Sequence, residues 1–170
     1  MKKVPMAAVI LLVGAVIAFF AYTNWSSVPQ LSSADPVSIP PKAFEGFEKC
    51  SSSGELIEIT NNLFTNEEPI VKEEWAWVYA VKSEFMGLPV EAIELGVCDS
   101  SGERGCGWSM YTALVITKPL AETKKYLEDK TGIDFTQEER DMEAEVTLRP
   151  ILAAGGTEGK SILFCDSGSL

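Results

Sequence analysis

Residues 4–22 form an uncharged and almost wholly apolar run that directly follows Lys2 and Lys3. As a helix, a run of this length spans about 28 Å, which is close to the roughly 30 Å hydrocarbon core of a bilayer. Apolar side chains on every face distinguish it from the amphipathic helices that pack against a globular core. The run therefore predicts one transmembrane helix, so that residues 1–22 are an anchor or a signal segment.

A secretory signal peptide is the alternative to a retained anchor. The apolar region of a signal peptide usually covers about 7–15 residues and leads to a cleavage site of small residues. In this chain the bulky side chain of Phe19 disfavours cleavage after Ala21. Cleavage after Ala18 or Thr23 stays open, but the length of the run and its flanking residues favour a retained anchor.

The distribution of positive charge predicts how this helix is oriented. Lys2 and Lys3 precede the run, and the next basic residue is Lys42. By the positive-inside rule, the N-terminus stays in the cytoplasm and the rest of the chain lies in the periplasm or outside the cell. Tyr22 and Trp25 then fall in the far headgroup layer, where amphipathic aromatic rings are favoured.

Gly14 and Ala18 lie four residues apart and therefore on one face of the predicted membrane helix. Small side chains at this spacing let two helix backbones approach closely within a bilayer. We expect this face to pack against a helix of another protein. Membrane-complex proteins are therefore the expected partners.

The chain carries 25 acidic and 14 basic residues, a formal net charge of −11. Because Lys2 and Lys3 lie on the cytoplasmic side, the exported part is more acidic still. Binding to nucleic acid requires a basic surface and is therefore not expected. Anionic lipid surfaces should repel the domain as well, so we expect the charge to serve mainly solubility.

Four cysteines follow the predicted membrane helix, which is an even number in a compartment that favours oxidation. They predict two disulfides, for which three connectivities are open. No two of them have the two-residue spacing of a zinc knuckle or a thioredoxin-like redox site. Cys98 and Cys106 flank a turn-rich stretch, which favours pairing them with each other. Cys50 and Cys165 would then join the two ends of the domain.

The region after the membrane helix divides into a tether and one domain. Residues 23–41 are rich in Pro and Ser and lack hydrophobic periodicity, so we expect an extended tether. Residues 42–170 then form the extracytoplasmic domain, which is long enough to enclose a single hydrophobic core.

The first part of this domain predicts a short strand at residues 55–60 and a helix over residues 66–86. Asn66 suits an N-cap, Pro69 falls in the first turn, and apolar residues recur at helical spacing. Aromatic residues also alternate over residues 75–81, which favours a strand there instead. The capping signals decide the prediction for the helix.

The second part predicts a hairpin from residues 90–98 and 107–117, followed by a helix over residues 120–130. Residues 144–153 alternate between apolar and polar, and residues 161–165 return as the second strand of another hairpin. The order of elements is therefore αββαββ. It predicts an α+β fold with an antiparallel sheet of about four strands and both helices on one face.

The chain contains no histidine, which limits its chemistry. It excludes serine and cysteine triads with a histidine base, zinc sites of the HExxH type and histidine-ligated haem. Carboxylate-pair chemistry remains open, but no motif marks a particular pair. The acidic stretches 99–103 and 134–143 lack the spaced ligands of an EF-hand. No catalytic, cofactor or metal site is therefore predicted.

Residues 154–161 fit a relaxed P-loop pattern in which Ala154 replaces the first glycine. A P-loop must lead into a helix whose N-terminal amides hold the phosphates. Ser161 instead opens a run of strand-forming residues. We therefore expect a glycine-rich hairpin turn.

Trp75, Trp77 and Tyr79 belong either to the core or to a surface that binds a partner. On the predicted helix, Trp75 and Tyr79 share the buried stripe and Trp77 falls off it. Trp77 is therefore the residue expected to be exposed and to contact a partner.

The function expected from these features is that of a non-catalytic, single-pass membrane-anchored accessory or binding subunit in a larger complex. The alternatives are an exported enzyme that acts on envelope polymers through carboxylates, and a soluble binding protein released by cleavage. A deep pocket with two acidic groups of perturbed pKa would favour the enzyme. A flat surface with an exposed Trp77 would favour the subunit.

Overall fold

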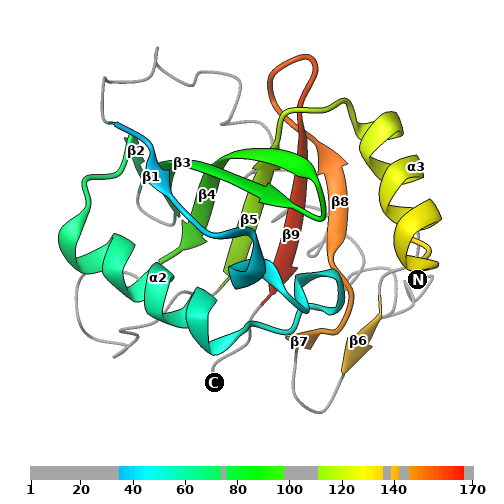
Figure 1. Cartoon of the computed structure of the whole chain (residues 1–170), viewed down its shortest axis with the longest axis horizontal. Helices are drawn as coiled ribbons and strands as arrows, with labels where there is room; N and C mark the ends of the chain where they lie inside the picture. The colour runs from blue at the N-terminus through cyan, green and yellow to red at the C-terminus, as the bar shows by residue number, and fades with distance from the viewer. Residues whose placement is uncertain (1–34, 74–75, 98–110, 136–138, 142–145, 167–170) are drawn as a thin grey trace, which may run out of the picture.

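The computed structural model describes an α+β domain with a mixed sheet (Figure 1). None of its described helices combines the length and apolar character needed to cross a membrane, and the predicted anchor lies outside the described residues. Those residues are 35–73, 76–97, 111–135, 139–141 and 146–166. The helices among them are α2 (Gly54–Asn66), α3 (Leu120–Thr131) and two short 3-10 helices, η2 (Pro41–Phe44) and η3 (Phe47–Lys49).

A seven-stranded sheet lies at the centre of the domain and has more strands than the four expected. β1 pairs with β3 in parallel, and the other pairs are antiparallel. In spatial order the strands are β1 (Val37–Ser38), β3 (Ala76–Phe85), β4 (Leu88–Gly96), β5 (Tyr111–Ile116), β9 (Ser161–Asp166) and β8 (Ile151–Ala154), and β2 (Val71–Lys72) also pairs with β3. A separate small sheet holds β6 (Arg140–Asp141) and β7 (Val146–Thr147).

Residues 55–60, which were expected to be a strand, belong to α2. Ser53 caps this helix, because its side-chain oxygen accepts a hydrogen bond from the backbone N–H of Leu56 at 3.0 Å. Leu56 and Leu63 are buried on one face of the helix. The predicted strand covers only a few residues, whereas the helical spacing of apolar residues continues through α2 and decides the structure.

The helix expected over residues 66–86 is wrong, and the rival strand interpretation is right. Asn66 is the last residue of α2 rather than an N-cap, and β3 follows. Tyr79 and Val81 of β3 face the helices, whereas Val78 faces the opposite side of the sheet. A repeat of two residues lets this strand contribute to both faces of the sheet, which an amphipathic helix cannot do.

The later elements agree better with the predictions made from the sequence. β4 and β5 pair as the hairpin predicted from residues 90–98 and 107–117, and α3 matches the predicted helix 120–130. The strand expected over residues 144–153 is divided into β7 and β8 by a bend. β8 and β9 form the second hairpin, and β9 also pairs with β5. Both hairpins therefore lie in one sheet.

Both helices pack against one face of the sheet, as expected. Leu63 of α2 and Leu127 of α3 share a buried cluster with Ile93, Leu114 and Leu163 from three strands of the sheet. None of these five side chains exposes any surface to solvent. The main core therefore lies between this face of the sheet and the helical layer (Figure 1).

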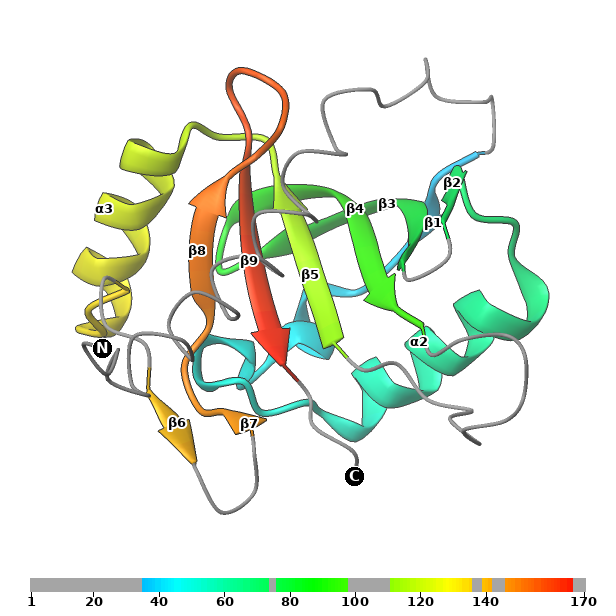
Figure 2. The same cartoon turned by 180° about the vertical axis from the view of Figure 1, so that it is seen from behind.

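The opposite face carries no helix among the described residues, and Figure 2 views it from the front. We call it the helix-free face. Val78, Ala92 and Val115 form a second buried apolar cluster there, against which Ile70 and Val71 pack. These side chains alternate along their strands with those of the main core, because successive residues of a strand point to opposite faces.

The folded domain includes the end of the expected tether. β1 pairs with Val81 and Lys82 of β3, and Ile39 is buried in the main core. The Ser83 hydroxyl donates a hydrogen bond to the carbonyl oxygen of Ile39 at 2.8 Å. Residues 37–41 therefore pack with the domain.

Replacing Ser53 by alanine should lower the free energy of unfolding by about 1–2 kcal/mol. The Ser53 hydroxyl caps α2 and also donates to the carbonyl oxygen of Ala43 at 2.6 Å, so the substitution removes two hydrogen bonds. Urea unfolding of S53A measures the loss, with the neighbouring S52A as the control. Equal midpoints for the two variants would contradict a stabilising role of the cap.

Candidate functional site

Glu94 of β4 is the only acidic side chain that is buried among the described residues, with 8% of its surface exposed. It lies on the helix-free face, where the strand register places it between Val78 of β3 and Ala113 of β5. Tyr111 donates a hydrogen bond from Oη to Glu94 Oε1 at 2.5 Å. We call these two residues the Glu94–Tyr111 pair.

Neighbouring residues hold the Tyr111 ring over this position. The ring lies 4.8 Å from that of Phe164 on β9, with 38° between their planes. It also fills the space next to Gly96, where an added Cβ would collide with its carbon atoms. Glycine at position 96 is therefore a packing requirement that lets Tyr111 reach Glu94.

Burial raises the pKa of Glu94 above its ordinary value of 4.5, because the ionised form loses its hydration. The hydrogen bond from Tyr111 lowers this pKa, and the negative charge of Glu73 raises it. Burial is the largest of these causes. The pKa of Tyr111 is raised as well, first by burial and then by the charge of Glu94, so the phenol keeps its proton.

Among the described residues, the charges that act on the pair are acidic. None of the ion pairs found among the described residues includes Glu94. Glu73 acts on both members of the pair, and Asp166 lies opposite Tyr111 in the β5–β9 ladder. A buried acid that lies beside other acids favours its neutral form.

Proton binding is the chemistry that this arrangement supports. A buried carboxyl with a raised pKa can keep a proton at a pH at which an exposed glutamate has lost it. The described residues contain no group of three or more Cys, Asp or Glu side chains placed to hold a metal ion. The Glu94–Tyr111 pair is therefore a candidate proton-responsive site.

Tyr79 is a second buried phenol, on the main-core side of β3. It exposes 1% of its surface, and its hydroxyl finds no hydrogen-bond partner within the described part of the chain. Burial, and then the charge of Glu68, raises the pKa of Tyr79 to about 12. Its ring packs edge to face against Phe64 of α2. Tyr79 is therefore a neutral packing residue.

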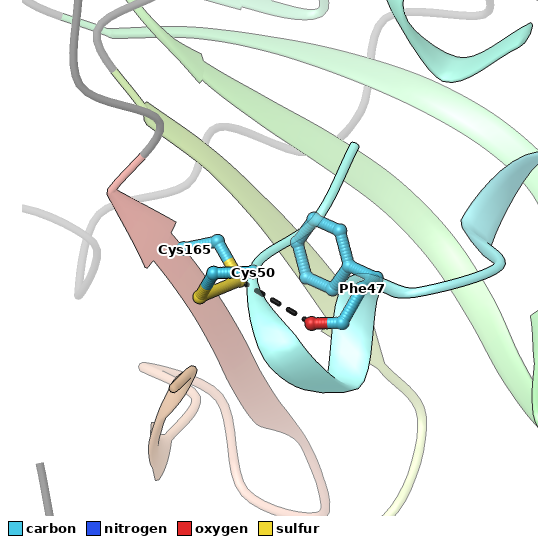
Figure 3. The surroundings of a disulfide bond; sticks show 3 residues. All are labelled: Phe47, Cys50 and Cys165. Carbon is cyan, nitrogen blue, oxygen red and sulfur yellow. Dashed lines mark hydrogen bonds between the residues drawn. A yellow bond between two sulfur atoms is a disulfide. The ribbon is translucent and has the colours of Figure 1, made fainter. Parts of the chain in front are cut away.

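A disulfide joins Cys50 and Cys165, which confirms the predicted link between the two ends of the domain (Figure 3). The two Cα atoms lie 5.3 Å apart, and 115 positions separate the residues in sequence. Cys165 Sγ lies 3.4 Å from the carbonyl oxygen of Phe47. Cys98 and Cys106, predicted to form the other disulfide, lie outside the described residues.

The disulfide lies beside an aromatic cluster of the main core. Phe44 of η2, Phe47 of η3 and Phe85 of β3 contact one another edge to face, with ring centroids 6.0–6.5 Å apart. All three are buried. Because η3 has only three residues, it gains little from its own backbone hydrogen bonds. The covalent link to β9 therefore helps to keep Phe47 in the cluster.

The glycine-rich turn between β8 and β9 is a hairpin turn, as expected. The N–H of Gly155 donates to the carbonyl oxygen of Lys160 at 2.9 Å. The Lys160 ammonium forms an ion pair with Glu91 of β4, and the Ser161 hydroxyl donates to Thr123 Oγ1 of α3 at 2.8 Å. The two side chains that a P-loop would use are therefore bonded within the fold.

The helix-based argument for an exposed Trp77 does not apply, because Trp77 lies on β3. Its ring is half-buried, with the ring of Phe64 at 5.4 Å and Lys72 Nζ at 4.2 Å. A partner contact at Trp77 stays a prediction. So do the roles of the membrane residues, which lie outside the described part: Lys2, Lys3, Gly14, Ala18, Tyr22 and Trp25.

Comparisons of the chain with protein-family models, curated proteins and solved structures found no match. The site is therefore interpreted from its own residues. Sequence analysis did not single out Glu94 or Tyr111. The available signal was an acid inside the apolar strand 90–98, with a tyrosine in the partner strand of the predicted hairpin. Without the register, this signal does not show that the two side chains meet.

Replacing both Cys50 and Cys165 by serine should lower the free energy of unfolding by about 3–5 kcal/mol. This magnitude follows from the long loop that the bond closes in the unfolded chain. Urea unfolding of the double variant measures the loss. The variant C98S/C106S is the matched control, because its predicted loop is far shorter. An unchanged midpoint for the Cys50 and Cys165 variant would contradict a stabilising role of this disulfide.

Replacing Glu94 by glutamine should remove a pH dependence of stability. Above pH 4.5 the unfolded chain loses the Glu94 proton while the folded chain keeps it, so the free energy of unfolding falls as pH rises. The fall ends once the pH exceeds the raised pKa, because both the folded and the unfolded chain are then ionised at Glu94. E94Q carries no such proton and should show no fall from this position.

Urea unfolding at pH 4, 6 and 8 measures this effect as the difference in stability between E94Q and the parent chain. The difference should move in favour of E94Q as pH rises. The exposed residue Glu58 on α2 provides the control variant E58Q. A constant difference across the three pH values would contradict a raised pKa for Glu94.

Proposed function

We propose that this chain is a non-catalytic, single-pass membrane-anchored accessory or binding subunit that presents its α+β domain outside the cytoplasm within a larger membrane complex. The observation that carries the proposal is the Cys50–Cys165 disulfide. Disulfides persist in oxidising compartments and are rare in the cytosol. The positive-inside rule, applied to Lys2 and Lys3, assigns the domain to the same side of the membrane.

The apolar run 4–22 supports the anchored part of the proposal, because its length matches the thickness of a bilayer. Gly14 and Ala18 support a partner within the membrane, because small residues on one helix face permit close helix packing. The polar segment 23–34 leaves a length of chain between the membrane and β1.

The surroundings of Glu94 support binding rather than catalysis. Carboxylate-pair hydrolases hold two acids about 5–10 Å apart, across a gap that the substrate enters. Glu94 is instead enclosed between Val78 and Ala113, and one of its oxygens accepts the hydrogen bond of Tyr111. A carboxyl enclosed in this way is accessible to a proton more readily than to a polymer.

An exported enzyme is the second candidate, and one observation favours it. Glu94 has the raised pKa of a general acid, and Glu73 is a second acid close enough to influence it. This candidate requires that the purified chain hydrolyse cell-envelope polymers. Absence of hydrolysis by the parent chain would leave the subunit as the better account.

Alkylation in intact cells tests the compartment. Without reductant, a thiol reagent should leave Cys50 and Cys165 unmodified, and reduction should make both reactive. The variant C98S/C106S assigns the modification to this pair of cysteines. Alkylation of Cys50 and Cys165 in intact cells before reduction would overturn the proposed location.

Membrane extraction tests the anchor and the assembly. The full chain should stay in the membrane fraction after an alkaline wash, whereas L12R should not, because a charge at the centre of the run opposes insertion by about 3 kcal/mol. L12V is the matched control. In native mass measurements after detergent extraction, the chain should occur in a complex of constant stoichiometry. A chain that purifies alone, with an N-terminus near Ala21, would instead support the released binding protein.

A further inference from the structure

Residues 70–73 form a short segment that contains β2 and packs beside β3. We call it the β2 strap. Outside the two-residue β2 ladder, it is held by hydrogen bonds from the N–H of Ile70 to the carbonyl oxygen of Val78 at 2.7 Å, and from the N–H of Glu73 to that of Ala76 at 2.9 Å. A segment with so few backbone bonds can open without unfolding the rest of the domain.

The strap covers part of the helix-free face. Ile70 and Val71 pack against the cluster of Val78, Ala92 and Val115, whose members expose 5% or less of their surface. The register places Val71 beside Val78, and Val78 beside Glu94. The apolar side of the strap therefore lies two strands away from the buried carboxyl.

The end of the strap brings a negative charge close to this carboxyl. The Glu73 side chain is exposed and acts electrostatically on both Glu94 and Tyr111. The other groups facing Glu94 are Val78 from β3 and Ala113 from β5, which carry no charge, and Asp166 from β9 lies beyond Tyr111. The described residues place no cation between the two glutamates.

We propose that Glu94 and Glu73 form a pH-sensitive latch on the β2 strap. The strap stays on the sheet while Glu94 carries a proton, and the strap opens when Glu94 loses that proton to water. When Glu94 is neutral, no charge repulsion acts between Glu94 and Glu73. Tyr111 then donates its hydrogen bond to an oxygen of the buried acid. With Glu94 ionised, a buried and poorly hydrated carboxylate is repelled by the negative charge of exposed Glu73.

Opening of the strap moves the Glu73 carboxylate away from Glu94, and it removes Ile70 and Val71 from the apolar cluster next to the buried carboxyl. Both changes favour the ionised form of Glu94. The ladders that join β3, β4, β5 and β9 stay intact, because β3 is the one strand of the described residues with which β2 pairs. Opening also uncovers the apolar cluster of Val78, Ala92 and Val115, so a rise in pH changes which surface the domain presents. The direction of the Glu94 pKa, which burial raises, agrees with this device.

Hydrogen exchange of the full chain in detergent, followed by mass spectrometry, tests the latch. After correction for the intrinsic effect of pH, protection of the Ile70 and Glu73 amides should fall severalfold between pH 4 and pH 8, because proton linkage favours the open strap once Glu94 ionises. Protection of the Ile93 and Leu114 amides in the central strands should not change.

Two variants separate the latch from a general loss of stability. E94Q should keep the strap protected at every pH, and E73Q, at an exposed position, should weaken the fall in protection without altering the core. E58Q is the control and should behave as the parent chain. If E94Q folds poorly, E73Q still decides the question.

Three outcomes would overturn the proposal. The first is strap protection that is independent of pH in the parent chain. The second is a pH-dependent fall that E94Q and E73Q leave unchanged. The third is an equal fall in the central strands, which would show that the whole domain responds to pH rather than the strap.

Discussion

The register between β4 and β5 is the constraint on which both faces of this domain depend. The two-residue repeat of β4 directs Ile93 to the main core and Ala92 and Glu94 to the helix-free face. The same register brings Tyr111 to Glu94, because Gly96 leaves room for its ring. A slip by one residue would exchange the two sets and bury a carboxyl among the helices. The hydrophobic core and the acidic pair therefore form together.

The two edges of the sheet differ in what keeps them from pairing with another chain. One edge holds β1 and β2, which have two residues each, and short edge strands offer little backbone for pairing with another chain. At the other edge α3 lies beside β8 in both views (Figures 1 and 2). The Cys50–Cys165 disulfide joins the helical layer to β9. These features leave the helix-free face as the side on which a small local change can alter the exposed surface of the domain.

The predictions from sequence succeeded where local signals and tertiary packing agreed. The helix predicted over residues 120–130 matches α3, which Gly132 ends in the left-handed conformation that favours glycine. They failed at residues 66–86, where Asn66 and Pro69 imitate the start of a helix but only follow the end of α2. The pattern in β3 serves two buried faces, so its apolar residues also fit a helical repeat. Pairing with β4 decides between the two, and a single strand does not contain that information.

By itself, the sequence determined the properties that depend on composition and local order: the length of the apolar run, the absence of histidine, the acidic charge and the hairpins. It favoured the link between Cys50 and Cys165 among three connectivities, and the structure confirmed that link. Tertiary structure alone decided which side chains share a face. Glu94 meets Tyr111, and Trp77 meets Phe64, through contacts between strands or between strand and helix. Such contacts depend on register and packing, which arise only when distant segments of the chain come together.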